Sequence, residues 1–435
     1  MKVTGIIAEY NPFHKGHQYQ IETLRRRYEP DYVIVAMSGD FLQRGTPALM
    51  DKYARAQMVL SQGADLVFEL PALFSTASAE NFARGGILLF QTTGITDSLC
   101  FGAESDDLPR LSKLAGLMLE EPEWYRSALL SYLKEGLSFP AARAKALPEY
   151  ADLLETPNNI LAIEYLKSIK SLASDIAPIL LRREGSGYHD ADVQAPFASA
   201  SAIRYALMPS DSQSTAFPRT GSHATAAPTG SRNTASPDKL PENLKAALPI
   251  DSFQIMTDYQ KNSAFLWEND FSLLLHHALL KETPESLLQY EDMTESLANR
   301  LYQQRNSFLS WSSFCEACDT RDITYARISR ILTHLLLDIK KEASAPYTEG
   351  SAHTLPYLRI LGFRQSAAPL LTELKRAAKA PLITSPAAAE KLLPEQGLAM
   401  LHTDIYASDI YRSVLTGKTG NIYPGEYRRK LLIVE

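Results

Sequence analysis

The sequence has little cysteine and no long apolar run. Its three cysteines are Cys100, Cys315 and Cys318, and the last two form a lone C-x-x-C pair. Because no second Cys/His pair stands at a suitable spacing, we interpret them as structural residues and predict no metal site. The start, MKVTGIIAEYNPF, has no basic segment followed by a long apolar run, since Glu9 interrupts it. We therefore predict neither a signal peptide nor a membrane span, and we expect a cytoplasmic protein.

An excess of positive charge is also absent. The formal net charge is −6, which argues against a uniformly basic surface that would attract nucleic acid. A local basic stripe would still suffice to bind RNA, because the overall sum hides how the charges are distributed. Of the 435 residues, 45% are hydrophobic and 22% are charged, as in ordinary globular proteins. This length indicates two or three domains of about 100–200 residues each.

Short apolar runs alternate with amphipathic segments in the first part of the chain. The predicted elements are, in order, strand 3–10, helix 16–28, strand 32–39, helix 51–63, strand 65–71, helix 78–94, strand 98–105, helices within 108–172 and strand 177–184. Strands that alternate with helices form βαβ units, so we predict an α/β fold with a Rossmann-like parallel sheet covered by helices on both faces. Ligands are expected beyond the carboxyl ends of the strands, where NPFHKGH, SGD and FGAES fall.

The composition changes abruptly between Pro209 and Pro241, where Ser, Thr, Ala, Pro and Gly dominate. Such a segment buries too little apolar area to offset its ordering entropy, so we interpret it as a flexible insert or linker. Amphipathic patterns such as YARISRILTHLLL predict helices after it. We therefore expect a sheet domain over 1–208, a low-complexity linker over 209–245 and a helical domain over 246–435.

The segment His14-Lys15-Gly16-His17 stands directly after the first strand and opens the first helix. Unpaired backbone N–H groups and the positive end of the helix dipole make such a helix start suitable for a triphosphate. Gly16 has no Cβ and would let phosphates approach the backbone closely. We predict that His14 and His17 donate hydrogen bonds to an α-phosphate under attack, which makes them the catalytic residues of a nucleotidyl transfer. Two incidental or packed histidines near a turn are the alternative.

The end of the second strand, in VAMSGDFLQRG, provides a second set of candidates. Ser38, Gly39 and Asp40 are placed to contact a nucleotide or a second substrate. Gln43 and Arg44 follow and could hold an anion. A solvated turn is an equally good interpretation of this segment.

Three later positions could contribute to the same site. Gly102 would permit close approach of an adenosine, or it forms a simple tight turn. Asn158 or Asn159 stands at a helix start, where Asn is more often an N-cap than a ligand contact. Arg182 and Arg183 could pair with phosphate, because the guanidinium fork matches its oxygens, or they are surface charges.

The stretch FASASAIRYAL predicts a second phosphate clamp. Ser199 and Ser201 stand at a helix start, and Arg204 follows one turn later. Hydroxyl groups, helix N–H groups and a guanidinium on one face would together hold a phosphate. A plain N-cap with an exposed arginine is the alternative.

These motifs resemble a known family. HKGH with ASASAIR resembles the H-x-G-H and I-S-S-T-x-I-R pair of the HIGH-type nucleotidyltransferase superfamily, with Ala200 in place of the second serine. More narrowly, IIAEYNPFHKGHQYQ, MSGDFLQRGTPAL, GADLVFELP, PNNILAIEYL, GSGYHD and PYLRILGF resemble the tRNA(Met) cytidine acetate ligase family. The resemblance covers nearly the whole chain except the low-complexity segment. It implies an enzyme that uses ATP to activate acetate as acetyl-adenylate and then acetylates N4 of the wobble cytidine in elongator tRNA(Met).

The resemblance also implies which ligands and residues take part. ATP is expected as a substrate, accompanied by Mg²⁺ that its phosphates and water largely hold. Acetate and elongator tRNA(Met) are the expected partners, and only one of the two neighbouring asparagines is expected to contact ATP. The implied ATP site consists of Ile7, Ala8, Glu9, Tyr10, Asn11, Pro12, Phe13, His14, Lys15, Gly16, His17, Gln18, Tyr19, Gln20, Gly102, Asn158, Asn159, Arg182 and Arg183.

Basic residues of the predicted helical domain are candidate contacts for the tRNA. Phosphate contacts of Lys and Arg give affinity without sequence specificity, and tyrosines can stack on unpaired bases. The basic candidates are Arg321, Arg327, Arg330, Lys340 and Lys341, followed in the tail by Arg412, Lys418, Arg428, Arg429 and Lys430. The interleaved tyrosines are Tyr411, Tyr423 and Tyr427. A solvated charged face is the alternative for any single member.

The residues leave two other functions open. The same ATP site could transfer AMP or CMP to a small phosphorylated acceptor. A non-enzymatic module that binds RNA or a nucleotide is the third possibility, and the intact pair of histidines argues against it.

Overall fold

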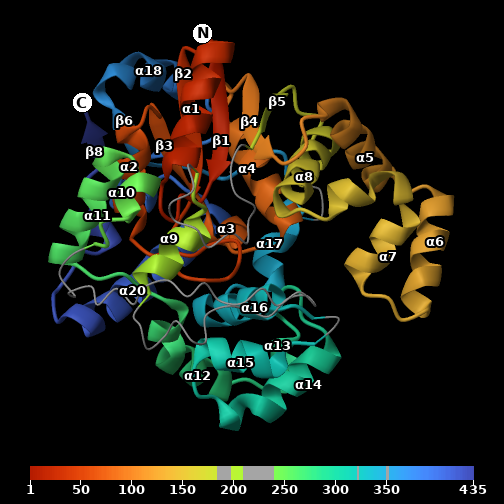
Figure 1. The fold of residues 1–435 in the computed structure, drawn as a ribbon. Helices are drawn as coiled ribbons and strands as arrows, with labels where there is room; N and C mark the ends of the chain where they lie inside the picture. Colours follow the sequence, from red (N-terminus) through yellow and green to blue (C-terminus); the bar gives the residue numbers. More distant parts are fainter. Residues whose placement is uncertain (184–196, 209–239, 321–322, 349–351) are drawn as a thin grey trace.

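The computed structural model describes residues 1–183, 197–208, 240–320, 323–348 and 352–435 (Figure 1). Within them, a sheet of eight strands has the order β5-β4-β1-β2-β3-β6-β7, and β8 pairs with β6. The strands are β1 (Val3–Ala8), β2 (Tyr32–Ser38), β3 (Leu66–Leu70), β4 (Ser98–Ala103), β5 (Ala177–Arg182), β6 (Leu358–Arg364), β7 (Leu382–Ile383) and β8 (Leu432–Val434). Strands β1 to β5 are parallel, whereas β6 is antiparallel to β3. The predicted α/β class with a Rossmann-like parallel sheet is confirmed.

Helices cover the sheet and continue beside it. Up to residue 208 they are α1 (Lys15–Tyr28), α2 (Lys52–Ser61), α3 (Ala72–Ser75), α4 (Ala79–Thr93), α5 (Leu108–Glu120), α6 (Glu123–Lys134), α7 (Phe139–Ala146), α8 (Pro157–Ser171) and α9 (Ala200–Leu207). From residue 240 they are α10 (Leu244–Ala247), α11 (Ile250–Asn262), α12 (Ser272–Leu280), α13 (Pro284–Leu287), α14 (Glu295–Gln304), α15 (Trp311–Cys318), α16 (Tyr325–Leu337), α17 (Lys341–Thr348), α18 (Ala368–Ala377), α19 (Pro386–Ala389) and α20 (Glu395–Thr419). Short 3-10 turns are η1 (Pro148–Leu154), η2 (Glu268–Phe271), η3 (Arg305–Ser307), η4 (Gln365–Ala367) and η5 (Glu426–Arg428).

Side chains of the central strands alternate between two apolar cores. On β2, Val33, Val35 and Met37 belong to the core that α1 and α2 cover. Ile34 and Ala36 belong to the other core, which α4 and α8 cover. A parallel strand that is buried on both faces has a nearly continuous apolar sequence, and YVIVAM is such a run. The prediction that helices cover both faces of the sheet is confirmed.

The chain beyond residue 246 is mainly helical, as predicted, but it also contributes strands β6, β7 and β8 to the sheet. Strand β6 has the sequence LRILGFR and continues the sheet beside β3, which would otherwise be an unpaired edge. Arg359 of β6 reinforces this contact through an ion pair of 3.2 Å with Glu69 of β3. Gly362 permits close packing, because a Cβ there would lie 2.7 Å from Leu432 and 3.0 Å from Leu60. Helical periodicity missed β6 because a short apolar run does not by itself distinguish a strand from a buried helix.

Helices α12 to α16 form a lobe on the side of the sheet where the parallel strands end (Figure 1). The loop after β2 connects the sheet to this lobe, since Ser329 of α16 donates a hydrogen bond of 2.5 Å to the Gly45 carbonyl. Trp311 of α15 in turn donates to the Ser329 hydroxyl at 3.2 Å. Gly45 has a φ of +69°, and a Cβ there would lie 2.3 Å from the backbone nitrogen of Arg330. Loop and helix therefore pack backbone against backbone.

Some predicted segments lie outside the described residues. They are GSGYHD at 185–190 and most of the low-complexity linker, residues 209–239. The linker and the domain boundary expected there stay predictions. Of the helices that are described, none has both the length and the apolar character needed to cross a bilayer.

Candidate active site

The helix α1 begins at the histidine motif. His14 is its N-cap residue, and the Nδ1 atom of His14 accepts a hydrogen bond of 3.1 Å from the backbone N–H of Gly16. The Nδ1 atom of His17 accepts one of 3.3 Å from the backbone N–H of His14. A backbone N–H only donates, so Nδ1 of each ring is unprotonated, and a neutral ring carries its proton on Nε2. This reciprocal capping box therefore leaves each ring with an Nε2–H donor.

Burial keeps both imidazole rings neutral. The two rings stack with 3.7 Å between their centroids, and Tyr10 and Phe13 pack around His17 at 4.9 and 5.5 Å. Burial lowers the pKa of His14 to about 3, and the charge of Arg183 contributes to this shift. Burial and the neighbouring His14 lower the pKa of His17 well below its usual value. His14 is buried and His17 is partly exposed, so at neutral pH the motif presents uncharged hydrogen-bond donors.

Two glycines allow close packing around these rings. A Cβ on Gly16 would lie 2.9 Å from the Cε1 atom of His14, so the capping ring itself requires glycine there. A Cβ on Gly102, near the end of β4, would lie 3.1 Å from the Cγ atom of Arg183. The ends of β4 and β5 therefore bring Gly102 and Arg183 together, and the charge of Arg183 also lowers the pKa of His14.

The predicted phosphate clamp lies beside the loop that precedes His14. Ser199 is the N-cap of α9 and accepts a hydrogen bond of 3.1 Å from the N–H of Ala202, which is the alternative that the sequence left open. Arg204 donates to the Asn11 carbonyl at 2.7 Å and to the Ser201 hydroxyl at 3.2 Å. The clamp residues are thus close to the histidine motif, and Arg204 helps to fix the loop before it.

Arg55 was missed by the sequence analysis, although it binds the backbone on which the site is built. The side chain is fully buried at 0% exposure. It donates hydrogen bonds to four main-chain carbonyls, those of Glu9, Ser38, Gly39 and Met50. These contacts tie the carboxyl ends of β1 and β2 to α2. A signal was present, since Arg55 precedes Met58 and Val59 by three and four residues and so stands on the apolar stripe of the helix.

Two acidic residues after β4 hold other predicted ATP contacts. Glu104 accepts a hydrogen bond of 2.6 Å from the Asn158 amide and one of 2.9 Å from the backbone N–H of Asn159. Asn159 is buried, whereas Asn158 is partly exposed. The exposed Arg182 lies 3.6 Å from the Asp106 carboxylate. Of the two asparagines, Asn158 therefore has the side chain that a ligand reaches more easily, and Glu104 is a second residue that the sequence analysis missed.

The Asp40 carboxylate has partners within the chain, and its predicted contact with a ligand stays a prediction. The Asp40 carboxylate is buried and accepts hydrogen bonds of 2.8 Å from the N–H of Lys52 and from the Ser408 hydroxyl. It therefore braces α2 and α20. Gln43 contributes through its backbone, because its N–H donates to the Glu9 carboxylate at 2.8 Å. This strand end supports the loop before the histidine motif more than it presents side chains to a ligand.

Many predicted tRNA contacts have partners within the chain. Arg327 donates to the Asp292 carbonyl, and Arg330 lies 3.1 Å from the Asp292 carboxylate. Tyr411 is buried and its hydroxyl donates to the Ala48 carbonyl at 2.9 Å, so the prediction that it stacks on an unpaired base is wrong. Further pairs are Lys340 with Asp338, Arg412 with Asp409, Lys418 with Asp270, Arg429 with Asp51 and Tyr427 with Glu390.

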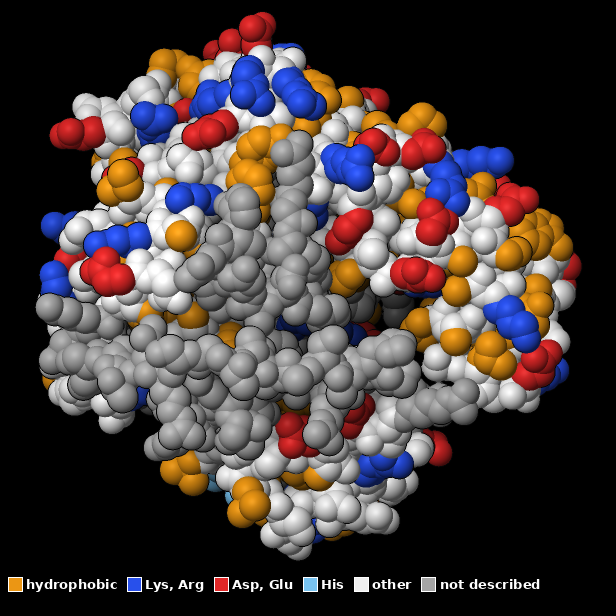
Figure 2. Space-filling model, viewed as in Figure 1, with side chains coloured by type: hydrophobic (Ala, Val, Ile, Leu, Met, Phe, Trp, Pro, Cys, Tyr) orange, Lys and Arg blue, Asp and Glu red, His pale blue; other side chains and the backbone are white. Residues whose placement is uncertain are grey.

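On one face of the molecule, the charge of the described residues is mixed rather than basic (Figure 2). On the face drawn in Figure 2, basic and acidic side chains are interspersed over the described residues. Arg321 lies outside the described residues, so its predicted contact stays a prediction. The tail residues Arg428 and Lys430 are both exposed.

The cysteines and the acidic residues offer no obvious metal centre. Cys100, Cys315 and Cys318 are buried free thiols that pack in the two apolar cores. Within the ranges that the structure describes, no group of three or more His, Cys, Asp or Glu side chains is arranged to hold a metal ion.

The chain is similar to known proteins over most of its length. The HIGH Nucleotidyl Transferase family matches residues 1–423. The tRNA(Met) cytidine acetate ligase of Thermoanaerobacter sp. (strain X514) is 36% identical over 418 residues, which cover 94% of this chain and 95% of the relative. The tRNA(Met) cytidine acetate ligase of Acetivibrio thermocellus is 33% identical over 419 residues, with 94% of each chain covered.

Two crystal structures of Thermotoga maritima TmcAL are similar over the whole length. The structure with bound alpha-thio ATP has a TM-score of 0.84, and the apo structure has a TM-score of 0.86. Both are 28% identical in sequence and cover 100% of each chain. The chain therefore belongs to the HIGH nucleotidyltransferase family and, within it, to the tRNA(Met) cytidine acetate ligases.

Proposed function

We propose that the protein activates acetate with ATP and acetylates N4 of the wobble cytidine in elongator tRNA(Met). The strongest support is the pair of stacked neutral imidazoles whose Nδ1 atoms are used by the capping box. Their Nε2–H groups at a helix start suit phosphate oxygens. The ATP analogue in the TmcAL structure and the substrate named for the relatives support ATP and tRNA as the ligands. A tRNA substrate would also locate the reaction in the cytoplasm.

In the first half-reaction, an oxygen of acetate attacks the α-phosphorus of ATP and pyrophosphate leaves. Negative charge grows on the non-bridging oxygens as phosphorus becomes five-coordinate. His14 and His17 would donate Nε2–H hydrogen bonds to these oxygens, and preorganised donors of this kind stabilise a transition state. Arg183, which the structure places beside Gly102, would neutralise phosphate charge. The products are acetyl-adenylate and pyrophosphate.

In the second half-reaction, the N4 amine of cytidine attacks the acetyl carbonyl carbon. The bond to the AMP oxygen breaks, AMP leaves and the nitrogen loses one proton. AMP is a good leaving group, so the reaction needs positioned substrates rather than a protein nucleophile. The three buried cysteines are not required for this chemistry.

We also propose that Mg²⁺ accompanies ATP. The neutral Nε2–H donors of the histidine motif fit phosphate oxygens rather than a metal ion. The ion would therefore be held largely by phosphate oxygens and water. When bound, it would neutralise charge on the leaving pyrophosphate.

Two assays test this function. Incubation with ATP, labelled acetate and unmodified total tRNA, followed by nucleoside analysis, should place the label on cytidine as N4-acetylcytidine. Label missing from cytidine would remove the RNA assignment. Exchange of pyrophosphate into ATP should depend on acetate. Exchange that requires a phosphorylated acceptor instead would support transfer of a nucleotidyl group to a small molecule.

A further inference from the structure

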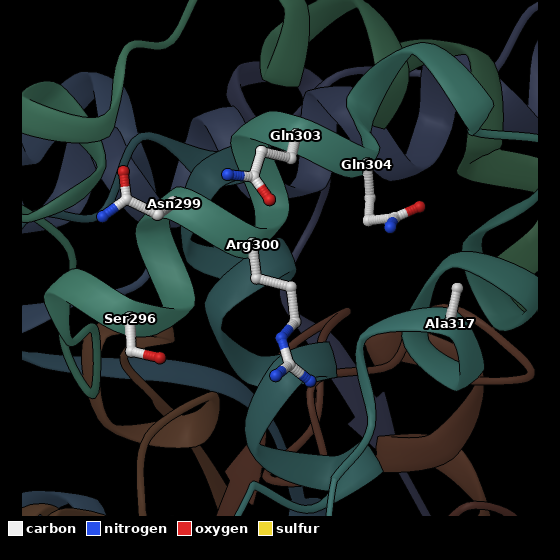
Figure 3. A pocket seen from close by; sticks show the side chains of 6 residues that line it. All are labelled: Ser296, Asn299, Arg300, Gln303, Gln304 and Ala317. Atoms are coloured by element: carbon white, nitrogen blue, oxygen red, sulfur yellow. The ribbon is translucent and has the colours of Figure 1, made fainter.

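A polar cavity lies between α14 and α15, away from the histidine motif. It has a volume of about 540 Å³ and is lined by Ser296, Asn299, Arg300, Gln303, Gln304 and Ala317 (Figure 3). All but the last belong to α14, where they recur at helical spacing. Leu297, Ala298 and Leu301 fill the opposite face of α14 and are buried in the core. Helix α14 therefore presents a continuous polar face to this cavity.

Arg300 carries the only charge among the lining residues. Its Nη1 donates a hydrogen bond of 3.4 Å to the Cys318 carbonyl, and no carboxylate of the described residues forms an ion pair with it. By contrast, Arg327 and Arg330 of the same lobe both contact Asp292. A guanidinium has five N–H donors in a fork that matches phosphate. Most donors of Arg300 are thus available to a ligand.

We propose that this cavity binds one nucleotide of the RNA substrate. Arg300 contacts a phosphate, and the amides of Asn299, Gln303 and Gln304 contact the base or the ribose. Side-chain amides carry both donors and acceptors, so they can pair with the edges of an unpaired base. The inference rests on the proposed function, because it assumes that an RNA is the acceptor of the acetyl group.

The composition of the lining favours RNA over other ligands. Pockets for small molecules are mostly apolar and aromatic, and the cores of protein interfaces are enriched in aromatic residues. Here Ala317 is the one apolar lining residue, and no Asp or Glu takes part. The lobe lies on the side of the sheet where the parallel strands end (Figure 1). A tRNA is long enough to contact α14 while its wobble base occupies the histidine site.

The test compares variants of the full-length protein in binding to an unmodified tRNA(Met) transcript. Arg300→Ala should weaken binding by on the order of ten-fold and reduce the slope of log Kd against log salt by about one. Arg300→Lys keeps the charge but loses the fork, so it should restore the slope and only part of the affinity. The KM for tRNA should rise with the Kd, whereas kcat should change little. The double variant Asn299→Ala/Gln303→Ala should lower affinity with an unchanged salt slope.

Arg376→Ala is the matched control, because Arg376 is an exposed arginine on α18 that pairs only with Glu373 among the described residues. It should bind tRNA as the wild type does. The proposal would be overturned if Arg300→Ala bound the transcript with wild-type affinity and salt slope. It would also be overturned if the variant lost binding to another protein but not to the transcript. Acetate-dependent pyrophosphate exchange by the wild type needs no RNA. Its absence would refute the proposed function, whereas its presence together with normal tRNA binding by Arg300→Ala would refute this inference alone.

Discussion

The histidine motif at the start of α1 and the lobe of α12 to α16 use their polar side chains in different ways. In the motif, the ring of His17 accepts from the backbone N–H of His14 and the ring of His14 accepts from that of Gly16, which leaves one Nε2–H on each ring. In the lobe, Arg327 and Arg330 turn toward Asp292, which lies 35 and 38 positions away. The chemistry of a short motif can therefore be predicted from its sequence. A basic stretch shows only that positive charges are present, because their partners come from distant segments.

The largest effect is expected where the motif is tied to the rest of the sheet. Arg55→Met keeps an apolar stem but leaves four main-chain carbonyls, three of them buried, without this donor. Because unsatisfied buried groups are costly, the free energy of unfolding should fall by about 4 kcal/mol. Urea unfolding followed by circular dichroism measures this change. Arg376→Met, at an exposed arginine, should change it by less than about 0.5 kcal/mol, and similar values for the two variants would contradict the bracing role.

A second variant separates the catalytic role of the motif from its capping role. Asn is among the best N-cap residues, so His14→Asn should keep the cap while it removes the Nε2–H donor. Acetate-dependent pyrophosphate exchange should fall by about 10²–10³-fold, as for the loss of one donor to a transition-state oxygen. The unfolding midpoint should stay nearly unchanged. Full activity in this variant would refute the role assigned to His14.

A third pair of variants probes the contact between the sheet and the lobe. Gly45 and Gly136 both have positive φ, at +69° and +83°, but only Gly45 has neighbours within 4 Å of a built Cβ. In Gly136→Ala, the free energy of unfolding should therefore fall by about 1 kcal/mol, which is the backbone cost alone. In Gly45→Ala it should fall by about 3 kcal/mol, because the added Cβ also collides with its neighbours. Thermal unfolding of the two proteins gives the difference. Equal losses would mean that the loop and α16 separate easily.

The smallest effect concerns two buried histidines, one in each region. Burial lowers the pKa of His14 to about 3 and that of His334 to about 4. The unfolded chain then binds more protons than the folded chain at acidic pH. Stability from these groups is complete above about pH 6.5 and is lost progressively as the pH falls toward the folded pKa values. In His14→Asn and in His334→Gln, the unfolding free energy should fall less steeply between about pH 7 and about pH 5 than in the wild type. The same dependence on pH as in the wild type would contradict the burial of a neutral ring.

Sequence patterns located the elements whose signals are local. The run YVIVAM is apolar because both faces of β2 are buried, and it was recognised as a strand. Strand β6 was missed, although LRILGFR is a short apolar run between polar segments. Its partner β3 lies almost three hundred positions earlier, and no local pattern indicates that pairing.

In the candidate site, too, local signals were recognised and contacts between distant segments were missed. The residues His14, Gly16 and His17 were found because a strand, a turn and a helix start follow one another in the sequence. Arg55 and Glu104 were missed because their roles depend on carbonyl and amide groups of other segments. For the same reason, Asp40 and Tyr411 were assigned to ligands although they serve internal contacts.

By itself, the sequence determined the class of the sheet, the helix that starts at the histidine motif and the resemblance to a family of ligases. Periodicity, capping and turn chemistry act over a few residues, so they can be recognised in one chain. Only the tertiary structure decided which charges are available. The free energy of a charged side chain depends on burial and on partners from distant segments, which is why Arg327 contacts the Asp292 carbonyl whereas Arg300 contacts the Cys318 carbonyl.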